Sequence, residues 1–301
     1  MATGVREKSI PAIGARRRPL VWPRFLFAAS IFTLLVVVSA SMIFPYVWMT
    51  INSFKEKFFF YTNPYTLIPQ PITIETYVDA LGPGMVGRFL LNSALYACIV
   101  VTAQLLLNSL CAYAFARLEF PGRDVLFVLV LASMMLPGAV TLIPSFLVVN
   151  AFGLIGGGAG AAGSVLAVVL PSFAGAFGIF MLRQFFLNIP KELEDAAIVD
   201  GAGLLTTYWR IIMPLAKPAL LTLGLLVFLS EWNSFIWPLI VLNNTELYTV
   251  TIGINLFRQE ATTEWPRVFA GSVAATLPII VLFLITQRYI IGGISLSGLK
   301  G

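Results

Sequence analysis

The segment from Phe25 to Ile51 reads FLFAASIFTLLVVVSASMIFPYVWMTI and contains no charged residue. About 20 apolar residues in a helix are enough to cross the hydrocarbon core of a bilayer, which is about 30 Å thick. The alternative is a secretory signal peptide, whose apolar region has only about 7–15 residues and precedes a small-residue cleavage site. This segment is longer and lacks a convincing cleavage site, so we interpret it as a membrane span.

Five more stretches downstream have the length and apolar character of a span. The chain has 301 residues, of which 58% are hydrophobic and 11% charged, whereas soluble domains have about 25% charged residues. This composition excludes a soluble enzyme and predicts an all-α membrane protein with six transmembrane helices. The predicted spans cover residues 25–51, 89–115, 125–148, 164–182, 213–241 and 268–291.

Basic residues are concentrated ahead of the first span and contribute much of the net charge of +5. They include no nucleic-acid-binding motif, so they indicate a cytoplasmic topogenic tail and no nucleic-acid partner. Six spans return both termini to one side, which puts 14 Lys and Arg residues in the cytoplasm and 5 outside. We predict a cytoplasmic tail at 1–24, a transmembrane domain at 25–291 and a second cytoplasmic tail at 292–301.

The residues of common catalytic and metal sites are scarce. The chain has no histidine, and its two cysteines, Cys98 and Cys111, lie in one predicted helix. Thirteen helical positions span about 20 Å, far beyond the roughly 7 Å that a disulfide allows between Cα atoms. A phosphate-binding G-x-x-x-x-G-K-[ST] motif is also missing. We therefore expect no catalytic residue, no metal and no cofactor.

Two predicted external segments have unusual composition. Residues 53–87 contain four prolines and several aromatics, which suits either a cap on the external face or simple anchoring at the membrane surface. Residues 156–163 read GGGAGAAG. No Lys-Ser or Lys-Thr follows, so we interpret this segment as a flexible turn and not as a phosphate cradle.

The longest predicted cytoplasmic loop, residues 183–217, contains the strongest functional pattern. Pro190 suits the first turn of a helix, and the acidic residues that follow complement its positive end. Gly201 then interrupts this helix, and a second helical piece continues toward Pro214. On a period of 3.6 residues, Glu194 and Asp195 occupy one side. The other side carries Leu193, Ala196, Ala197 and Ile198.

This loop resembles the signature of the inner-membrane permeases of bacterial ABC importers. That signature is Glu-Ala-Ala, three residues, Gly, nine residues and Ile-x-Leu-Pro. The present chain has Asp195-Ala196-Ala197, then Gly201 and Ile211-Ile212-Met213-Pro214 at the same spacing. Asp195 and Met213 depart from the pattern, and Asp195 keeps the charge with a reach shorter by about one methylene.

The resemblance extends over nearly the whole chain and narrows to the carbohydrate-uptake branch, similar to the smaller permease of the maltose transporter. The segments that support it are Ser53-Phe54-Lys55, Asn92-Ser93, Ala112-Tyr113-Ala114-Phe115-Ala116-Arg117, Trp232-Asn233-Ser234-Phe235-Ile236-Trp237-Pro238-Leu239, and the terminal residues 287–301. It implies an inner-membrane permease subunit that imports a sugar or a related polyol.

In this family, the loop is a coupling helix that docks on an ATP-hydrolysing subunit, and we call residues 183–217 the coupling loop. The implied partners are a second homologous permease, two ATPase subunits, an extracytoplasmic substrate-binding protein and membrane lipid. The residues that we expect in the docking loop are Glu192, Glu194, Asp195, Ala196, Ala197, Asp200, Gly201, Ile211 and Pro214.

Several polar residues lie inside predicted spans. An acid such as Glu231 at the centre of a span costs about 2.5–3.5 kcal/mol, so it should face protein or water. In one interpretation, Glu231 and Asn233 face the translocation path or the partner permease. In the other, they form an interhelical hydrogen-bonded pair. Asn92 is assigned to the same path or interface, and it can also hold helices together, as Gln104 and Asn108 can.

Two other classes of function are considered. A secondary transporter driven by an ion gradient would also be helical with an intramembrane acid, and Glu231 is its best support. No inverted repeat is visible, however, and such a transporter needs no docking loop. A membrane scaffold or insertase without transport activity is the other alternative.

Overall fold

The computed structural model describes residues 22–63, 65–82, 86–156, 160–258 and 263–297. The chain divides into two units, one ending at Trp48 and the other beginning at Met49. The described part of the first unit is most of helix α1 (Trp22–Ser53), whose side chains are exposed over residues 26–47. Residues 1–21 of the predicted basic tail lie outside the described part of the chain.

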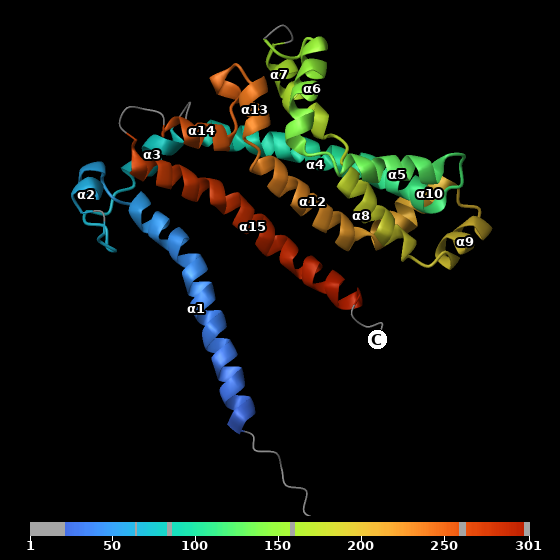
Figure 1. The fold of residues 1–301 in the computed structure, drawn as a ribbon, viewed down its shortest axis with the longest axis horizontal. Helices are drawn as coiled ribbons and strands as arrows, with labels where there is room; N and C mark the ends of the chain where they lie inside the picture. Colours follow the sequence, from blue (N-terminus) through green and yellow to red (C-terminus); the bar gives the residue numbers. More distant parts are fainter. Residues whose placement is uncertain (1–21, 64, 83–85, 157–159, 259–262, 298–301) are drawn as a thin grey trace, which may run out of the picture. The chain divides into compact units, whose positions relative to one another are not determined.

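The described residues of the second unit form helices joined by turns, with one isolated bridge between Lys55 and Ile72 and no strand (Figure 1). The predicted all-α fold is therefore confirmed. The longer helices are α4 (Val86–Arg117), α5 (Arg123–Ser133), α6 (Gly138–Ala151), α7 (Gly160–Val169), α8 (Ala176–Leu187), α12 (Lys217–Trp232) and α15 (Trp265–Ser297). The shorter elements are α2 (Lys57–Thr62), α3 (Glu75–Leu81), the 3-10 helix η1 (Leu170–Ser172), α9 (Glu192–Val199), α10 (Leu204–Thr207), the π-helix η2 (Tyr208–Ile212), α11 (Met213–Leu215), α13 (Ile236–Val241), the 3-10 helix η3 (Thr245–Leu247) and α14 (Val250–Leu256).

Among the described residues, three helices are each long and apolar enough to cross a membrane, namely α1, α4 and α15. Three pairs reach that length only together, and each is bent, by 104° between α5 and α6, by 49° between α7–η1 and α8, and by 77° between α10–α11 and α12. The number of spans is thus six if each bent pair is one span. The six predicted spans overlap these six elements.

The bends have local causes. Helix α5 ends at Ser133, and Pro137 precedes α6 in an extended conformation with a ψ of 135°. Proline donates no amide hydrogen and disfavours helical geometry in the residue before it, so 125–148 is not one helix. The predicted span 213–241 is also divided, because α12 ends at Trp232 and α13 begins only at Ile236.

Two predicted boundaries also change. Helix α15 continues to Ser297, so it enters the stretch 292–301 that was assigned to the C-terminal tail. Helix α7 begins at Gly160, so the glycine-rich stretch 156–163 is a turn only in its first part, and its residues 157–159 lie outside the described residues. The alanines of this stretch favour the helix that follows.

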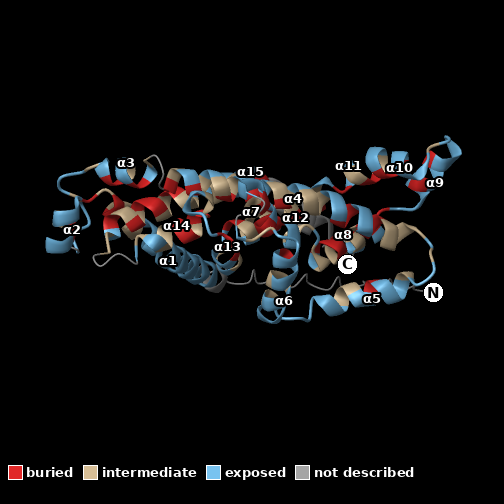
Figure 2. Ribbon diagram, turned by 90° about the horizontal axis from the view of Figure 1, so that it is seen from above, coloured by how far each residue is buried: buried red, intermediate tan, exposed pale blue. Residues whose placement is uncertain are grey.

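Helix α4 is the central element of the second unit. It packs against α8 and α12, and α12 packs in turn against α15. The buried residues at these contacts include Tyr113 from α4, Leu182 from α8 and Leu223 from α12 (Figure 2). In contrast, α5 and α6 each bury one side chain, Phe127 and Val149, so most of their surface is available to lipid or a partner.

Polar side chains of α4 hold the bend between η1 and α8. Gln104 donates to the Ser172 carbonyl at 2.8 Å, and Asn108 accepts from the Gly175 amide at 3.1 Å. The Asn108 side chain also donates to Gln104 at 3.1 Å. These contacts confirm the expectation that Gln104 and Asn108 hold helices together.

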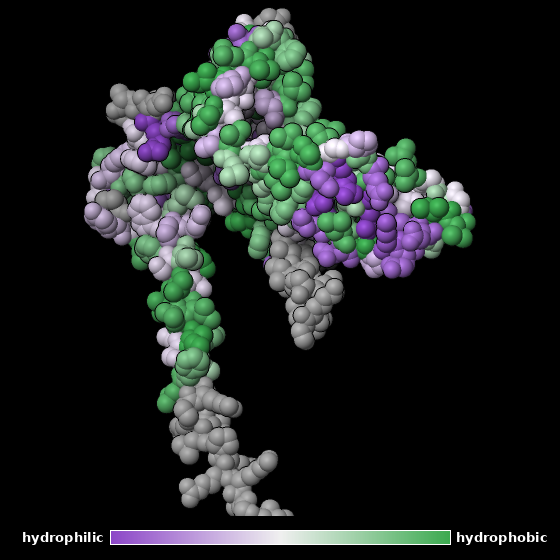
Figure 3. Space-filling view, turned by 45° about the vertical axis from the view of Figure 1, so that its right-hand side comes forward, coloured by the Kyte–Doolittle hydropathy of each residue, from purple (hydrophilic) through white to green (hydrophobic). Residues whose placement is uncertain are grey.

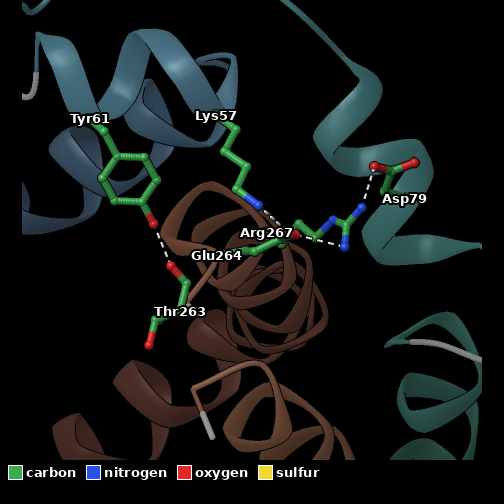
Figure 4. Close-up of polar contacts among 6 residues, drawn as sticks. All are labelled: Lys57, Tyr61, Asp79, Thr263, Glu264 and Arg267. Atoms are coloured by element: carbon green, nitrogen blue, oxygen red, sulfur yellow. Dashed lines mark hydrogen bonds and ion pairs between the residues drawn. The ribbon is translucent and has the colours of Figure 1, made fainter. Parts of the chain in front are cut away.

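Residues 53–87, which the sequence predicts to be external and which we call the external cap, are tied to the start of α15 by charged side chains (Figure 4). Glu264 pairs with Lys57 of α2 and, at 2.6 Å, with Arg267. Arg267 also pairs with Asp79 of α3 at 2.7 Å. A network of this kind fixes a surface element more firmly than an isolated exposed pair does.

The aromatic residues of the external cap divide between the two predicted roles. Phe60 is buried, and its ring centre lies 5.8 Å from that of Phe269, so this residue packs the cap against α15. Phe58 and Tyr65 are 75% and 91% exposed, which suits anchoring at a membrane surface.

The close approach of α8 to α4 depends on Gly178. A Cβ atom there would lie 2.3 Å from Nδ2 of Asn108 and 3.2 Å from Leu223. Because Asn108 is held by its hydrogen bonds, Gly178→Ala should lower the free energy of unfolding by about 1–3 kcal/mol. The measurement is thermal unfolding in detergent, followed by tryptophan fluorescence.

Gly224→Ala is the matched control, because a Cβ atom at Gly224 of α12 makes only an ordinary contact of 3.6 Å with Leu105. This variant should be as stable as the parent or slightly more stable, since alanine favours helix. Equal stability of the Gly178 and Gly224 variants would contradict the packing account.

Candidate functional site

The coupling loop folds as predicted into a short helix, a bend and further helical turns. Helix α9 starts at Glu192 with Lys191 at its N-cap, so Pro190 precedes the helix and does not lie in its first turn as predicted. Gly201 has a φ of +83°, a left-handed conformation that glycine adopts without strain. The Gly201 amide donates to Ile198 at 2.9 Å, and the Ala202 amide donates to Ala197 at 2.9 Å. This pair of bonds is a Schellman motif, which ends the helix sharply.

The orientation of α9 differs from the predicted one. Glu194 and Ala197 are the buried residues of this helix, whereas Leu193 and Ile198 are 43% and 57% exposed. The structure divides both predicted groups, because Glu194 is buried while Asp195 is exposed, and Ala197 is buried while Leu193 and Ile198 are exposed. The period of 3.6 residues could not show which residues of α9 face the rest of the subunit, because it could not reveal a cation from another helix that receives Glu194.

That cation is Arg117 at the C-terminal end of α4. Its Nε lies 2.5 Å from Oε1 of Glu194, and the two side chains are only 8% and 9% exposed. Tyr113, one turn earlier in α4, donates to the other carboxylate oxygen of Glu194 at 3.2 Å. A second nitrogen of Arg117 donates to the Ile189 carbonyl at 2.6 Å. Arg117 thus binds both α9 and the residue that leads into it.

A second contact joins the coupling loop to α4 at the π-helix η2. The Tyr208 and Ser109 hydroxyls are hydrogen bonded at 2.7 Å in a buried environment. The Tyr208 ring lies 5.3 Å from that of Tyr113, which also packs at 6.4 Å against Phe186. Single π-helical turns inside helices occur frequently at functional sites.

The outward side of the coupling loop combines acidic and apolar residues. Glu192, Asp195, Ala196 and Asp200 are exposed, as are Gly201 and Pro214, and Ile211 is half-buried. Exposed apolar side chains lie among them, with Val199 the most exposed at 87%. We call this group the apolar patch, and its members are Leu193, Ile198, Val199, Leu204, Leu205 and Trp209. In Figure 3, hydrophilic side chains gather at this end of the second unit with hydrophobic ones beside them.

The predicted intramembrane site residues are placed separately from one another. Glu231 of α12 is half-buried and lies beside the Ser172 side chain of η1. Asn233 is exposed and donates to Leu229 at 2.7 Å, so it closes the end of its own helix. Among the described residues, Glu231 and Asn233 are not hydrogen bonded to each other, and Glu231 instead lies beside η1.

Asn92 belongs to a polar grip at the other end of α4. It donates to the carbonyls of Glu246 at 2.8 Å and Tyr248 at 3.0 Å. Ser93 accepts from the Val250 amide at 2.9 Å, and Tyr96 donates to the Leu247 carbonyl at 2.8 Å. Asn92 therefore holds the segment 245–250 against α4.

Four residues that fasten the coupling loop had no role predicted from the sequence. Three of them occupy regular positions, because Ser109, Tyr113 and Arg117 are four residues apart on α4 and share one face. A polar stripe at this spacing at the end of an apolar span was the available signal. Tyr208, the fourth residue, gave no such signal because its partner is 99 residues away in the chain.

Comparisons with known proteins agree with this arrangement. The family described as "Binding-protein-dependent transport system inner membrane component" matches residues 104–292. The chain is 32% identical to the arabinooligosaccharides transport system permease protein AraQ of Halalkalibacterium halodurans, over 86% of this chain and 91% of that protein. It is also 32% identical to the trehalose/maltose transport system permease protein MalG of Thermococcus litoralis, over 88% of this chain and 94% of that protein.

A solved structure shares the fold. It is a chain in the crystal structure of a bacterial ABC transporter involved in the import of the acidic polysaccharide alginate, with a TM-score of 0.77 and 24% identity. The match covers 88% of this chain and 96% of that chain. With a family match over more than half of its length and close relatives over nearly all of it, the chain belongs to the family of binding-protein-dependent transport system inner membrane components.

Proposed function

We propose that this chain is the permease subunit of an ABC importer for a sugar or a related polyol. The observation that carries the proposal is the exposed coupling loop, whose acidic residues and apolar patch suit a cleft on a partner ATPase. An apolar patch that is rimmed by charged residues is typical of a protein–protein interaction site. The chain has no phosphate-binding motif of its own, so the energy of ATP must come from that partner.

The substrate class is supported by the relatives. The names of the two relatives above refer to arabinooligosaccharides and to trehalose or maltose. Another relative, 30% identical over 87% of this chain, is the sn-glycerol-3-phosphate transport system permease protein UgpE of Escherichia coli O157:H7. A polyhydroxylated substrate is the chemistry that these names have in common.

The assembly has further members. A second homologous permease completes the pore, two ATPase subunits bind on the cytoplasmic face, and an extracytoplasmic binding protein delivers the substrate. The subunit spans the inner membrane with both termini in the cytoplasm, which agrees with the excess of Lys and Arg in the cytoplasmic segments. ATP-driven closure of the ATPases moves the coupling loop and opens the pore outward, and hydrolysis resets it.

The first prediction concerns the energy source. Proteoliposomes that contain the complete complex should take up substrate only with internal ATP, and vanadate should abolish this uptake, because the pore moves with the ATPases. Radiolabelled sugar uptake measures both effects. Uptake that is driven by an ion gradient without ATP would instead assign the chain to the secondary transporters, and a complex without any uptake or substrate-stimulated ATPase activity would favour a scaffold.

The second prediction concerns docking. Val199→Glu places a charge in the apolar patch, and burying an unpaired charge in an interface is costly. The amount of ATPase that co-purifies with the variant should be at least tenfold lower than the amount that co-purifies with the parent chain. Val78→Glu is the matched control, because Val78 is 63% exposed on the helical external cap, away from the coupling loop. Equal retention of ATPase by both variants would contradict the assigned docking surface.

The third prediction concerns Glu231 and Asn233, which we assign to the lining of the translocation path. Glu231→Gln keeps a hydrogen-bonding group beside Ser172, so assembly should be unchanged while transport falls at least threefold. Asn233→Ala should lower transport by a similar factor. Uptake assays and size-exclusion chromatography measure the two properties. Full transport by both variants would leave these residues with a structural role only.

A further inference from the structure

We propose that Ser109, Tyr113 and Arg117 form a clamp that fixes the coupling loop to α4, so that α9, η2 and α4 move as one rigid body. The proposal rests on the proposed function, because it concerns how motion of the ATPase reaches the pore. The three residues are positioning residues and do not contact substrate. Their spacing, their burial and the contacts at the opposite end of α4 support this role.

The spacing gives the clamp its shape. Side chains four residues apart lie above one another on a helix, so the three residues form a stripe along the last turns of α4. Ser109 contacts Tyr208 of η2, and Tyr113 and Arg117 both contact Glu194 of α9. The two helical parts of the coupling loop are therefore held by one face of one helix.

Burial makes these contacts stiff. The side chains of Arg117 and Glu194 are less than a tenth exposed and form an ion pair. Tyr113 donates a hydrogen bond to Glu194, and Arg117 donates one to the Ile189 carbonyl; such hydrogen bonds to or from a charged group are stronger in these surroundings than in water. The planar guanidinium of Arg117 binds Glu194 and the Ile189 carbonyl together, which a lysine could not do with the same geometry. Rotation of α9 against α4 would break both contacts.

The two sides of α9 have separate roles. Glu194 and Ala197 face the clamp, whereas Ile198 and Val199 face outward in the apolar patch. A force that an ATPase applies to the outward side must therefore pass through the inward side to α4. Glu194 belongs to the clamp and not to the docking surface.

Helix α4 also has a grip at its other end. Asn92, Ser93 and Tyr96 bind backbone groups of residues 245–250. A helix of 32 residues is about 48 Å long, so α4 is long enough to extend from one membrane face to the other. Movement of the coupling loop is thus delivered to the 245–250 segment without an intervening flexible joint in α4.

A distance measurement tests rigidity directly in the assembled complex. Spin labels at Leu95→Cys on α4 and Lys191→Cys beside α9 are placed in a Cys98→Ser, Cys111→Ser background, since these are the only cysteines. Both labelled positions are exposed. Pulsed electron paramagnetic resonance should give the same narrow distance without nucleotide and after trapping with ATP and vanadate. A distance that changes between these two states would overturn the proposal.

A paired substitution tests the consequence for coupling. Arg117→Met with Glu194→Met removes both buried charges together, a change that buried ion pairs often tolerate without loss of stability. The double variant should still bind the ATPase, and its basal rate of ATP hydrolysis should stay within twofold of that of the parent chain. The stimulation of ATP hydrolysis by the substrate-loaded binding protein should fall at least fivefold. The label distance should broaden or change between states.

Arg123→Met with Asp124→Met is the matched control, because this pair on α5 is more exposed, at 32% and 78%, and joins neighbouring residues. It should behave as the parent.

If the Arg117 and Glu194 double variant does not assemble, Tyr208→Phe removes only one hydroxyl of the clamp and should lower stimulation at least twofold. Parental stimulation in the variant that assembles would contradict the clamp, as would loss of ATPase binding by the assembled double variant. A parent chain that retains no ATPase would instead contradict the proposed function.

Discussion

The buried ion pair between Arg117 and Glu194 determines how the coupling loop is presented. Removing each charge from water costs several kcal/mol, and the cost is offset only when the two charges meet with good geometry and additional hydrogen bonds. Tyr113 and the Ile189 carbonyl supply those bonds. Helix α9 must therefore turn Glu194 toward α4, and this orientation leaves Ile198 and Val199 on the outer surface. An internal electrostatic requirement thus creates the surface that is available to a partner.

The same helix α4 organises most of the second unit. Its middle holds the bend between η1 and α8 through Gln104 and Asn108, and Gly178 allows the two helices to approach. Its ends bind the coupling loop and the segment 245–250. The described polar contacts of α4 therefore lie at the places where the chain bends or changes direction, as expected where backbone groups would otherwise lack partners in lipid.

Much of this architecture could be predicted from the sequence. Apolar length located the six regions that are long enough to span a membrane as single helices or as bent pairs. The spacing from Asp195 through Gly201 to Pro214 located the coupling loop, and family membership confirms a transport subunit that is not an enzyme. The side of α9 that faces inward could not be predicted, because it depends on Arg117, which lies 77 positions earlier in the chain. Pro137 was expected to open a local gap in the backbone, but a bend of 104° beside it was not predicted, since prolines also occur within continuous helices such as α1 and α15.

The π-helix η2 has a consequence for how the chain tolerates changes in length. A π-helical turn contains one residue more than a regular helical turn. Deleting one residue between Tyr208 and Ile212 would convert the turn to a regular helical turn, and the segments on its two sides would keep nearly the same relative orientation, because each kind of turn closes one revolution. Tyr208 would then still face Ser109, and α12 would still face α4. Single-residue length differences among such subunits should therefore be accepted within these five residues, whereas in a regular part of the helix they would rotate the flanking segments by about 100°.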